Sequence, residues 1–129
     1  MFTIEQINHA HSKVRSGADF PAYIQDLRSL GVTAYDTFVT DGHTDYSGSG
    51  HYLASSLPQY PDLSIAERSD AEQFETDLKA HQQGHTNYHT FCNDCAISGI
   101  YKWTVNIGEM TCTYYDKAGS RILTEAIPN

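Results

Sequence analysis

Basic side chains are scarce in this chain of 129 residues, which has 8 lysines and arginines against 16 aspartates and glutamates and a formal net charge of −8. Such an acidic surface repels phosphate backbones, and no cluster of lysines or arginines reverses that repulsion locally. The composition therefore argues against direct binding to nucleic acid.

Long hydrophobic runs are also lacking. No apolar stretch approaches the roughly 18 residues that a membrane-spanning helix needs, and the segment MFTIEQINHAHSKVRSG has neither the basic start nor the apolar run of a secretory signal. The chain has only three cysteines, without the spacing of a disulfide framework. We therefore expect a cytoplasmic protein with reduced thiols, no membrane contact and no cofactor.

What is present is the composition of a folded protein. Hydrophobic residues make up 40% of the chain and aromatic residues 12%, values that are typical of a globular domain and not of a disordered segment. The length suffices for one domain with a hydrophobic core and is too short for two ordinary ones. The sequence therefore predicts a single domain over residues 1–129.

Helices are predicted where a start signal, an inward apolar face and a glycine stop occur together. The first begins with a capping box formed by Thr3 and Gln6, and the third begins with the matching pair Ser69 and Glu72. The pattern predicts four helices, over about residues 3–16, 19–30, 69–83 and 87–98.

Strands are predicted after each pair of helices. VTAYDTFVT runs through an Asp-Gly turn into HTDYSG, which is a strong hairpin signal, and LASSLP is a weaker third strand. In the second half, IYKWTVNI, MTCTYYD and RILTEAIP are separated by glycine-containing turns.

The two halves match when they are laid over one another at an offset of 68 residues. Glycines fall on glycines and aromatic residues on aromatic residues, with two short gaps. The matched pairs include Tyr23 with Phe91, Ile24 with Cys92, Leu27 with Cys95, Gly31 with Gly99, Tyr35 with Trp103, and Tyr46 with Tyr114.

We interpret this match as an internal duplication of residues 2–58 in residues 70–128, joined by a linker over residues 59–69. The alternative is that two helix–helix–hairpin segments share the same local signals without common origin. The fold class that follows is α+β, with two pseudo-repeated α-α-β-β-β units whose antiparallel sheet is covered by helices.

The stretch HTNYHTFCNDC is the sharpest chemical signal in the chain. Its side chains His85, His89, Cys92 and Cys95 fall on one arc of a helix, and imidazole and thiolate together suit zinc or iron. However, the repeat aligns the two cysteines with core residues, and no second ligand pair complements them. We therefore expect buried, reduced cysteines and no metal; a metal site and a redox dithiol are the alternatives.

A second candidate site lies in GHTDYSGSGHY. His43 and Asp45 are two residues apart on a hairpin strand, so their side chains share one face and could act as an oriented acid–base pair. A solvated hairpin without a function is the simpler interpretation. We expect any ligand groove to be lined by His43, Asp45, Tyr46 and His51, with Trp103 or Tyr114 as an apolar wall.

The segment AISGIYKWTVNIGEMTCTYYDKAGSRILTEAIP resembles the YdfO/YbcV-like family of small bacterial and prophage-borne proteins, as does the earlier LGVTAYDTF. The residues that carry the resemblance include Gly99, Trp103, the run from Met110 to Asp116, Gly119 and Pro128. The resemblance implies a compact α+β cytoplasmic domain and offers no catalytic residues. Members are sometimes labelled phage envelope proteins, a role that no residue here supports.

The function that we expect is that of an uncharacterised accessory protein, non-enzymatic and prophage-related, that binds a small molecule or a protein partner. Self-association into a homo-oligomer stays open. The alternative is a small enzyme or metal-binding protein that uses His43, Asp45 and His51 or the face that runs from His85 to Cys95.

Overall fold

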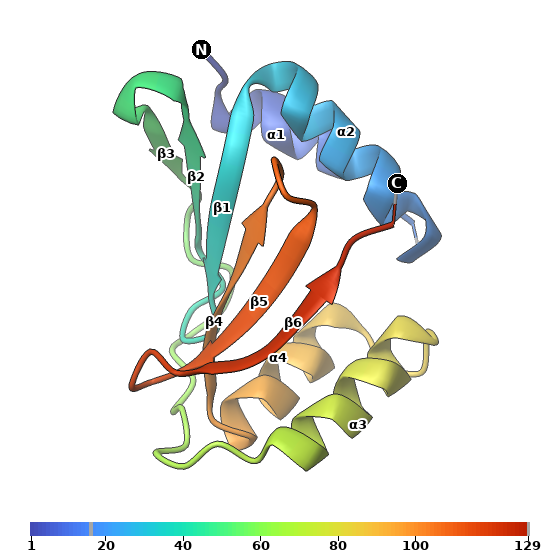
Figure 1. Ribbon diagram of the computed structural model, residues 1–129, viewed down its shortest axis with the longest axis vertical. Helices are drawn as coiled ribbons and strands as arrows, with labels where there is room; N and C mark the ends of the chain where they lie inside the picture. Colours follow the sequence, from blue (N-terminus) through green and yellow to red (C-terminus); the bar gives the residue numbers. More distant parts are fainter. Residues whose placement is uncertain (16, 129) are drawn as a thin grey trace.

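The structure is a computed structural model and describes residues 1–15 and 17–128 of the chain. Within these residues two helices and three strands are followed by two more helices and three more strands, which confirms the predicted α+β fold (Figure 1). All six strands join one antiparallel sheet in the order β3-β2-β1-β4-β5-β6, so the strands that follow each pair of helices meet at the centre of the sheet.

The bounds of most elements follow the sequence signals closely, but the first helix ends at His11, well before the predicted end near residue 16. The helices are α1 (Ile4–His11), α2 (Phe20–Leu30), α3 (Ala71–Gln82) and α4 (Tyr88–Ile97), with short 3₁₀ turns at Gly17–Asp19 and Ser49–His51. The strands are β1 (Val32–Phe38), β2 (Thr44–Gly48), β3 (Leu53–Ser55), β4 (Ile100–Asn106), β5 (Thr111–Asp116) and β6 (Arg121–Ala126).

The first predicted helix start is confirmed and the third needs a correction. The Thr3 hydroxyl accepts the Gln6 backbone N–H at 3.2 Å and the Gln6 side chain accepts the Thr3 N–H at 2.9 Å, which completes the capping box. In α3 the cap is Asp70 and not Ser69, because the Asp70 carboxylate accepts the N–H of Gln73.

The central strands β1 and β4 pair in a register that relates the two halves of the sheet symmetrically. Asp36 of β1 lies opposite Thr104 of β4, and these two residues are 68 positions apart. The β1–β2 ladder shifts register between Val32 and Ala34, and the β4–β5 ladder shifts at the positions 68 residues later. The register therefore places each residue of β1 in the same structural position as the residue 68 later in β4.

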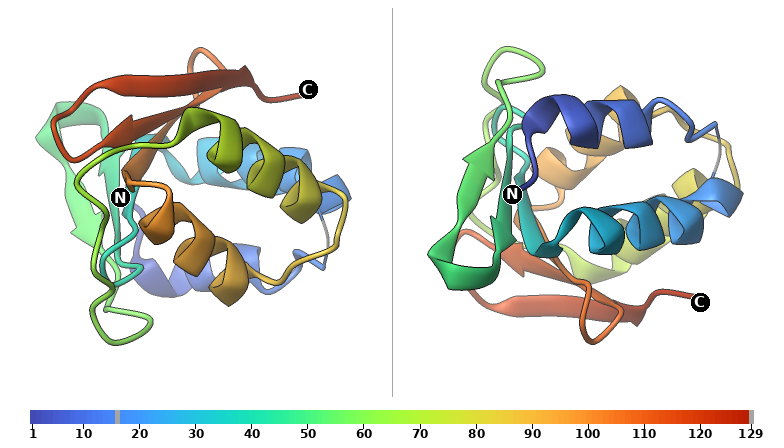
Figure 2. Two further views of the ribbon diagram at one scale, coloured as in Figure 1. Left: turned by 90° about the horizontal axis from the view of Figure 1, so that it is seen from below. Right: turned by 90° about the horizontal axis from the view of Figure 1, so that it is seen from above.

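Both pairs of helices pack on one side of the curved sheet, with α1 and α2 towards one end and α3 and α4 towards the other (Figure 2). Aromatic side chains fill the space between them: the Trp103 ring lies 5.8 Å from that of Phe91, and the Tyr114 ring lies 4.8 Å from that of Phe74. Because side chains alternate along a strand, the neighbouring residues of β1, β4 and β5 project from the other side of the sheet.

The linker over residues 59–69 closes one end of the sheet. The backbone N–H of Leu63 donates to the Thr40 carbonyl at 2.7 Å, and that of Ala66 donates to the Ala96 carbonyl at 2.9 Å. Ile65, between them, is buried. The linker is therefore an ordered part of the domain, held by the turn after β1 and by the end of α4.

Candidate functional site

The side of the sheet that faces away from the helices carries most of its charged and polar strand residues. We call it the open face; it includes Asp36, Phe38, Asp45, Lys102, Thr104 and Tyr115, all of them half-buried. Its members face one another across the strands, since Asp36 pairs with Asp45 on one side and with Thr104 on the other.

The most connected part of the open face surrounds His43, in the turn that leads into β2. The imidazole stacks on the Phe38 ring at 4.6 Å between centroids, and its Nδ1 lies 2.5 Å from an Asp41 carboxylate oxygen. Its Nε2 lies 3.7 Å from Oδ1 of Asp45. We call Phe38, Asp41, His43 and Asp45 the His43 cluster.

Asp41 holds His43 by two contacts. Its carboxylate accepts the backbone N–H of His43 at 3.0 Å as well as contacting Nδ1 of the ring. Burial by itself raises the pKa of the Asp41 carboxyl, but the hydrogen bonds from His43 outweigh it and leave the pKa below its ordinary value. Because Nδ1 is held by a carboxylate, Nε2 is the nitrogen that is directed to other partners.

The other half of the open face is built around Lys102. Its ammonium lies 5.8 Å from the Phe38 ring centroid and 5.5 Å from that of Tyr115, and it is 4.0 Å from Asp36. The Thr104 hydroxyl donates to the same Asp36 carboxylate, and Ser55 donates to Asp45 at 2.7 Å. These donors offset the repulsion between two carboxylates on neighbouring strands.

The residues predicted to line one groove lie in different places. His43 and Asp45 are on the open face, whereas Tyr46, Trp103 and Tyr114 are buried on the side that faces the helices. The reason is strand alternation: a one-residue step from Asp45 to Tyr46 crosses the sheet.

His51 lies apart from both groups. It is exposed in the 3₁₀ turn after β2, at the opposite end of that strand from His43. A strand rises roughly 3.3 Å per residue, so β2 separates the two histidines by about 15 Å. The structure therefore brings together His43 and Asp45 on the open face, and Trp103 and Tyr114 on the side that faces the helices, but it does not join the two pairs in one groove.

The prediction that His85, His89, Cys92 and Cys95 share one helix face is wrong for His85, which precedes α4. Cys92 and Cys95 are fully buried, which confirms the expected burial, while His85 and His89 are exposed. Among the described residues, no group of three or more histidine, cysteine or acidic side chains is arranged to hold a metal ion. Burial raises the pKa of both thiols, and a raised pKa makes a thiol less reactive.

Tyrosines are concentrated where the two pairs of helices meet over the sheet. Burial raises the pKa of Tyr23 from α2, of Tyr88 from α4, and of Tyr35 and Tyr46 from the sheet. Tyr88 is the first residue of α4, and 47% of its surface is exposed. The cluster supplies packing between the two halves.

Two shallow hollows also occur away from the His43 cluster, and sequence reasoning did not predict either. The first, of about 520 Å³, lies between α1 and α2 and is lined by Glu5, His9, Lys13 and Asp26 among others. The second, of about 430 Å³, lies where α2 ends and β1 begins, beside the turn after β4; Arg28 is its charged residue, and we call it the Arg28 hollow.

Other members of the open face were equally hard to find from the sequence. The predicted hairpin implied that Phe38 and His43 are close, but Lys102 reaches them only through the pairing of β1 with β4. No local signal specifies that pairing, because it joins segments from the two halves of the chain.

No helix in the described part of the chain is both long and apolar enough to cross a membrane.

Comparison with known proteins gives a family and no activity. No curated protein matches the sequence. A family model described as “Protein of unknown function (DUF1398)” matches residues 8–126. Since that match covers nearly the whole chain, the chain belongs to this family of proteins of unknown function.

Proposed function

We propose that the protein is a non-enzymatic binding protein and that its ligand is a small polar molecule held on the open face by the His43 cluster. The observation that carries the proposal is the separation of 3.7 Å between His43 Nε2 and Asp45 Oδ1. That distance is too long for a direct hydrogen bond, but one polar atom about 2.8 Å from each would contact both. A hydroxyl or amine group of a ligand has the required donor and acceptor capacity.

The surroundings of this gap support binding. Asp41 and the Phe38 ring fix the imidazole before any ligand arrives, so little side-chain ordering is needed on association. The half-buried ring of Tyr101 lies 5.8 Å from the Phe38 ring, and the half-buried ring of Tyr115 lies beside Lys102. Fixed polar atoms beside aromatic surface are typical of small-molecule sites.

The test is a ligand screen followed by substitution. Compounds that raise the melting temperature would be titrated into ¹⁵N-labelled protein, and we expect amide shifts around Phe38, His43 and Lys102. His43→Ala should abolish the binding, whereas His51→Ala and the exposed His85→Ala should retain it. An equal loss of ligand binding in His43→Ala and His51→Ala, or amide shifts confined to other surfaces, would contradict the proposal.

A small enzyme is the second candidate, and the contact between Asp41 and His43 favours it specifically. A carboxylate on Nδ1 orients an imidazole for proton transfer at Nε2. Recovery of a bound compound after prolonged incubation separates the two functions: an unchanged compound supports binding, and a new product lost in His43→Ala supports catalysis.

The cellular setting belongs to the same proposal. The resemblance to the YdfO/YbcV-like proteins supports a prophage-related accessory role, and the free, buried Cys92, Cys95 and Cys112 support a reducing compartment such as the cytoplasm. Genes next to this one, together with fractionation of the tagged protein, would test both points.

A further inference from the structure

The Arg28 hollow has a structurally equivalent site at the other end of the sheet. The register that places Asp36 opposite Thr104 relates the residues of β1 to those 68 positions later in β4, and the sequence match extends the same offset to α2 and α4. The pairs related in this way around the hollow are Ile107 with Val39, Gly108 with Thr40, Arg28 with Ala96, and Gly31 with Gly99.

The chain itself occupies the equivalent site. The linker crosses it in an extended course, donating backbone hydrogen bonds from Leu63 to the Thr40 carbonyl and from Ala66 to the Ala96 carbonyl. The Tyr60 hydroxyl donates to the Val39 carbonyl at 2.6 Å. The linker also approaches Gly99 so closely that a Cβ there would lie 2.5 Å from the Arg68 carbonyl oxygen.

The Arg28 hollow has the same framework without a segment of chain in it. A Cβ added at Gly31 would have no heavy atom within 4 Å, in contrast to Gly99. The carbonyls of Thr40 and Ala96 accept hydrogen bonds from the linker, and the carbonyls at the equivalent positions in the hollow are those of Gly108 and Arg28. The Ile107 carbonyl accepts from the Arg28 guanidinium at 2.7 Å, where its counterpart accepts from Tyr60.

The two sites differ in chemistry: Ser49 and Asn106 of the hollow correspond to Lys117 and Phe38. The difference that bears on a ligand is Arg28. Among the residues that line the hollow, Arg28 is the charged one, and it replaces an alanine at the equivalent position. A guanidinium has five N–H donors, so the bond to Ile107 leaves donors for a carboxylate. On a protein of net charge −8, this positive position selects for an acidic group.

We propose that the Arg28 hollow binds an extended segment of a partner protein, with an acidic side chain of that segment at Arg28. The segment would repeat the course of the linker, donating backbone N–H groups to the carbonyls of Gly108 and Arg28. This site lies at the opposite end of β1 from the His43 cluster and does not depend on the ligand proposed there.

The probe for the test is a synthetic peptide of residues 59–69, QYPDLSIAERS, because the equivalent site accepts this sequence. Added to the ¹⁵N-labelled full chain, it should produce saturable amide shifts at Gly31, Thr33, Asn106 and Gly108. Arg28→Ala should weaken its binding by about tenfold, as loss of a charge-assisted contact does.

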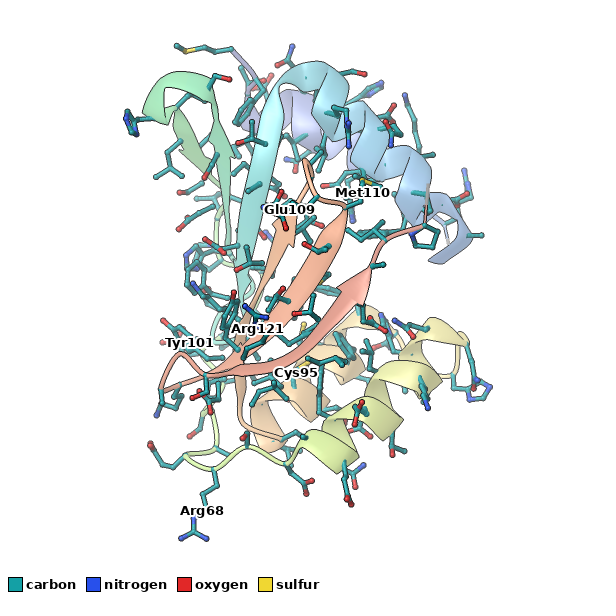
Figure 3. All side chains as sticks on the ribbon, viewed as in Figure 1. Arg68, Cys95, Tyr101, Glu109, Met110 and Arg121 are labelled. Atoms are coloured by element: carbon teal, nitrogen blue, oxygen red, sulfur yellow. The ribbon has the colours of Figure 1, made fainter. Side chains whose placement is uncertain are left out.

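Two further variants separate binding from folding. Ser49→Trp fills the hollow without removing the arginine and should abolish binding while leaving the melting temperature nearly unchanged, since Ser49 is exposed. Arg68→Ala is the matched control: this arginine projects into solvent at the end of the molecule away from the turn at Glu109 and Met110 (Figure 3). It should leave the affinity unchanged.

Several outcomes would overturn the proposal. These are no saturable shift at millimolar peptide, equal binding to wild type and Ser49→Trp, or shifts confined to Phe38, His43 and Lys102 on the open face. Identical shifts with acetate alone, and none added by the peptide, would make the hollow an anion site only.

Discussion

The two halves of this protein share one architecture and differ in what covers the ends of their strands. In the second half, the linker packs against the start of β4, whereas the start of β1 in the first half borders the Arg28 hollow. Their cores also differ, since Ile24 and Leu27 of α2 stand where α4 has Cys92 and Cys95, all four fully buried. Equivalent positions thus tolerate different volumes inside and different partners outside.

Both halves require side chains that pack against the sheet, whereas the types of these side chains and the segments that cover the strand ends differ between the halves. The common register and strand order are what a duplication requires, and the duplication itself stays a prediction. Superposition of residues 2–58 on residues 70–128 tests it, with Tyr35 expected over Trp103.

The largest expected effect comes from the matched core positions Leu27 and Cys95. Leu27→Ala removes three buried carbon atoms and leaves a cavity, so we expect the free energy of unfolding to fall by about 3 to 4 kcal/mol. Cys95→Ala removes one sulfur atom and should cost about 1 kcal/mol. Urea unfolding measures both values.

The same cysteine variant addresses the metal alternative. If the thiol only packs, added zinc or chelator should leave the unfolding midpoint of wild type and Cys95→Ala unchanged. Stoichiometric zinc in protein purified without chelator, or rapid labelling of Cys92 in the native state, would refute the packing role.

The matched glycines Gly31 and Gly99 give the next largest effect. Both have positive φ, +100° and +79°, so alanine at either position costs about 1 kcal/mol in backbone strain. At Gly99 the new Cβ would also meet the backbone of Arg68 and Ser69, at 2.5 and 2.8 Å, which raises the expected cost to roughly 3 kcal/mol. Thermal unfolding of the two variants compares them directly, and equal losses would mean that the linker yields easily.

A smaller effect is expected from Asp41, because its counterpart in the second half, Glu109, has Thr111 and not a histidine two residues later. Because hydrogen bonds from His43 lower the pKa of Asp41 in the folded state, its contribution is present above an unfolded pKa of about 3.9 and is lost as pH falls through the lower folded value. We expect roughly 0.5 kcal/mol, given partial exposure of both side chains.

Unfolding measured at several values of pH between 6 and 2 tests this contribution. Asp41→Asn should reduce the loss of stability at the acid end, and His43→Ala should reduce it partly, because the backbone N–H bond remains. If the free energy of unfolding falls equally towards pH 2 in the wild type and both variants, Asp41 makes no such contribution.

The smallest expected effect concerns the linker's ion pair. Lys117 Nζ lies 2.7 Å from Glu67, and both side chains are well exposed, so the pair should contribute only about 0.3 kcal/mol. A double-mutant cycle with Glu67→Gln and Lys117→Met measures the coupling, which should vanish in 1 M salt. A coupling above 1 kcal/mol would show that the linker depends on this contact.

Local signals predicted most of the fold. The capping box at Thr3, the left-handed glycines after α2 and α4, and period-two alternation in the strands depend on near neighbours, and each is found in the structure. Boundary errors were also local: Asp70 replaces Ser69 as a cap because both side chains are good caps one residue apart.

The candidate site was only partly predictable, for a different physical reason. The pair His43 and Asp45 could be found because it lies within one hairpin, and it holds in the structure. The proposed wall of Trp103 and Tyr114 was assigned by composition, without the side of the sheet on which each aromatic projects. The approach of Lys102 to Phe38 depends on strands from different halves, and a single sequence does not encode that distance in any local pattern.

The pairing of β1 with β4 also bears on how the chain folds. Every other ladder in the sheet joins strands that are neighbours in the sequence, so each half can form its own helices and hairpins quickly. The contact between Asp36 and Thr104 closes a loop of about 70 residues and brings both halves together at once, which is slow because of its entropic cost. Substitutions at the centre of β1 and β4 should therefore slow folding, whereas those in β3 or β6 should mainly speed unfolding.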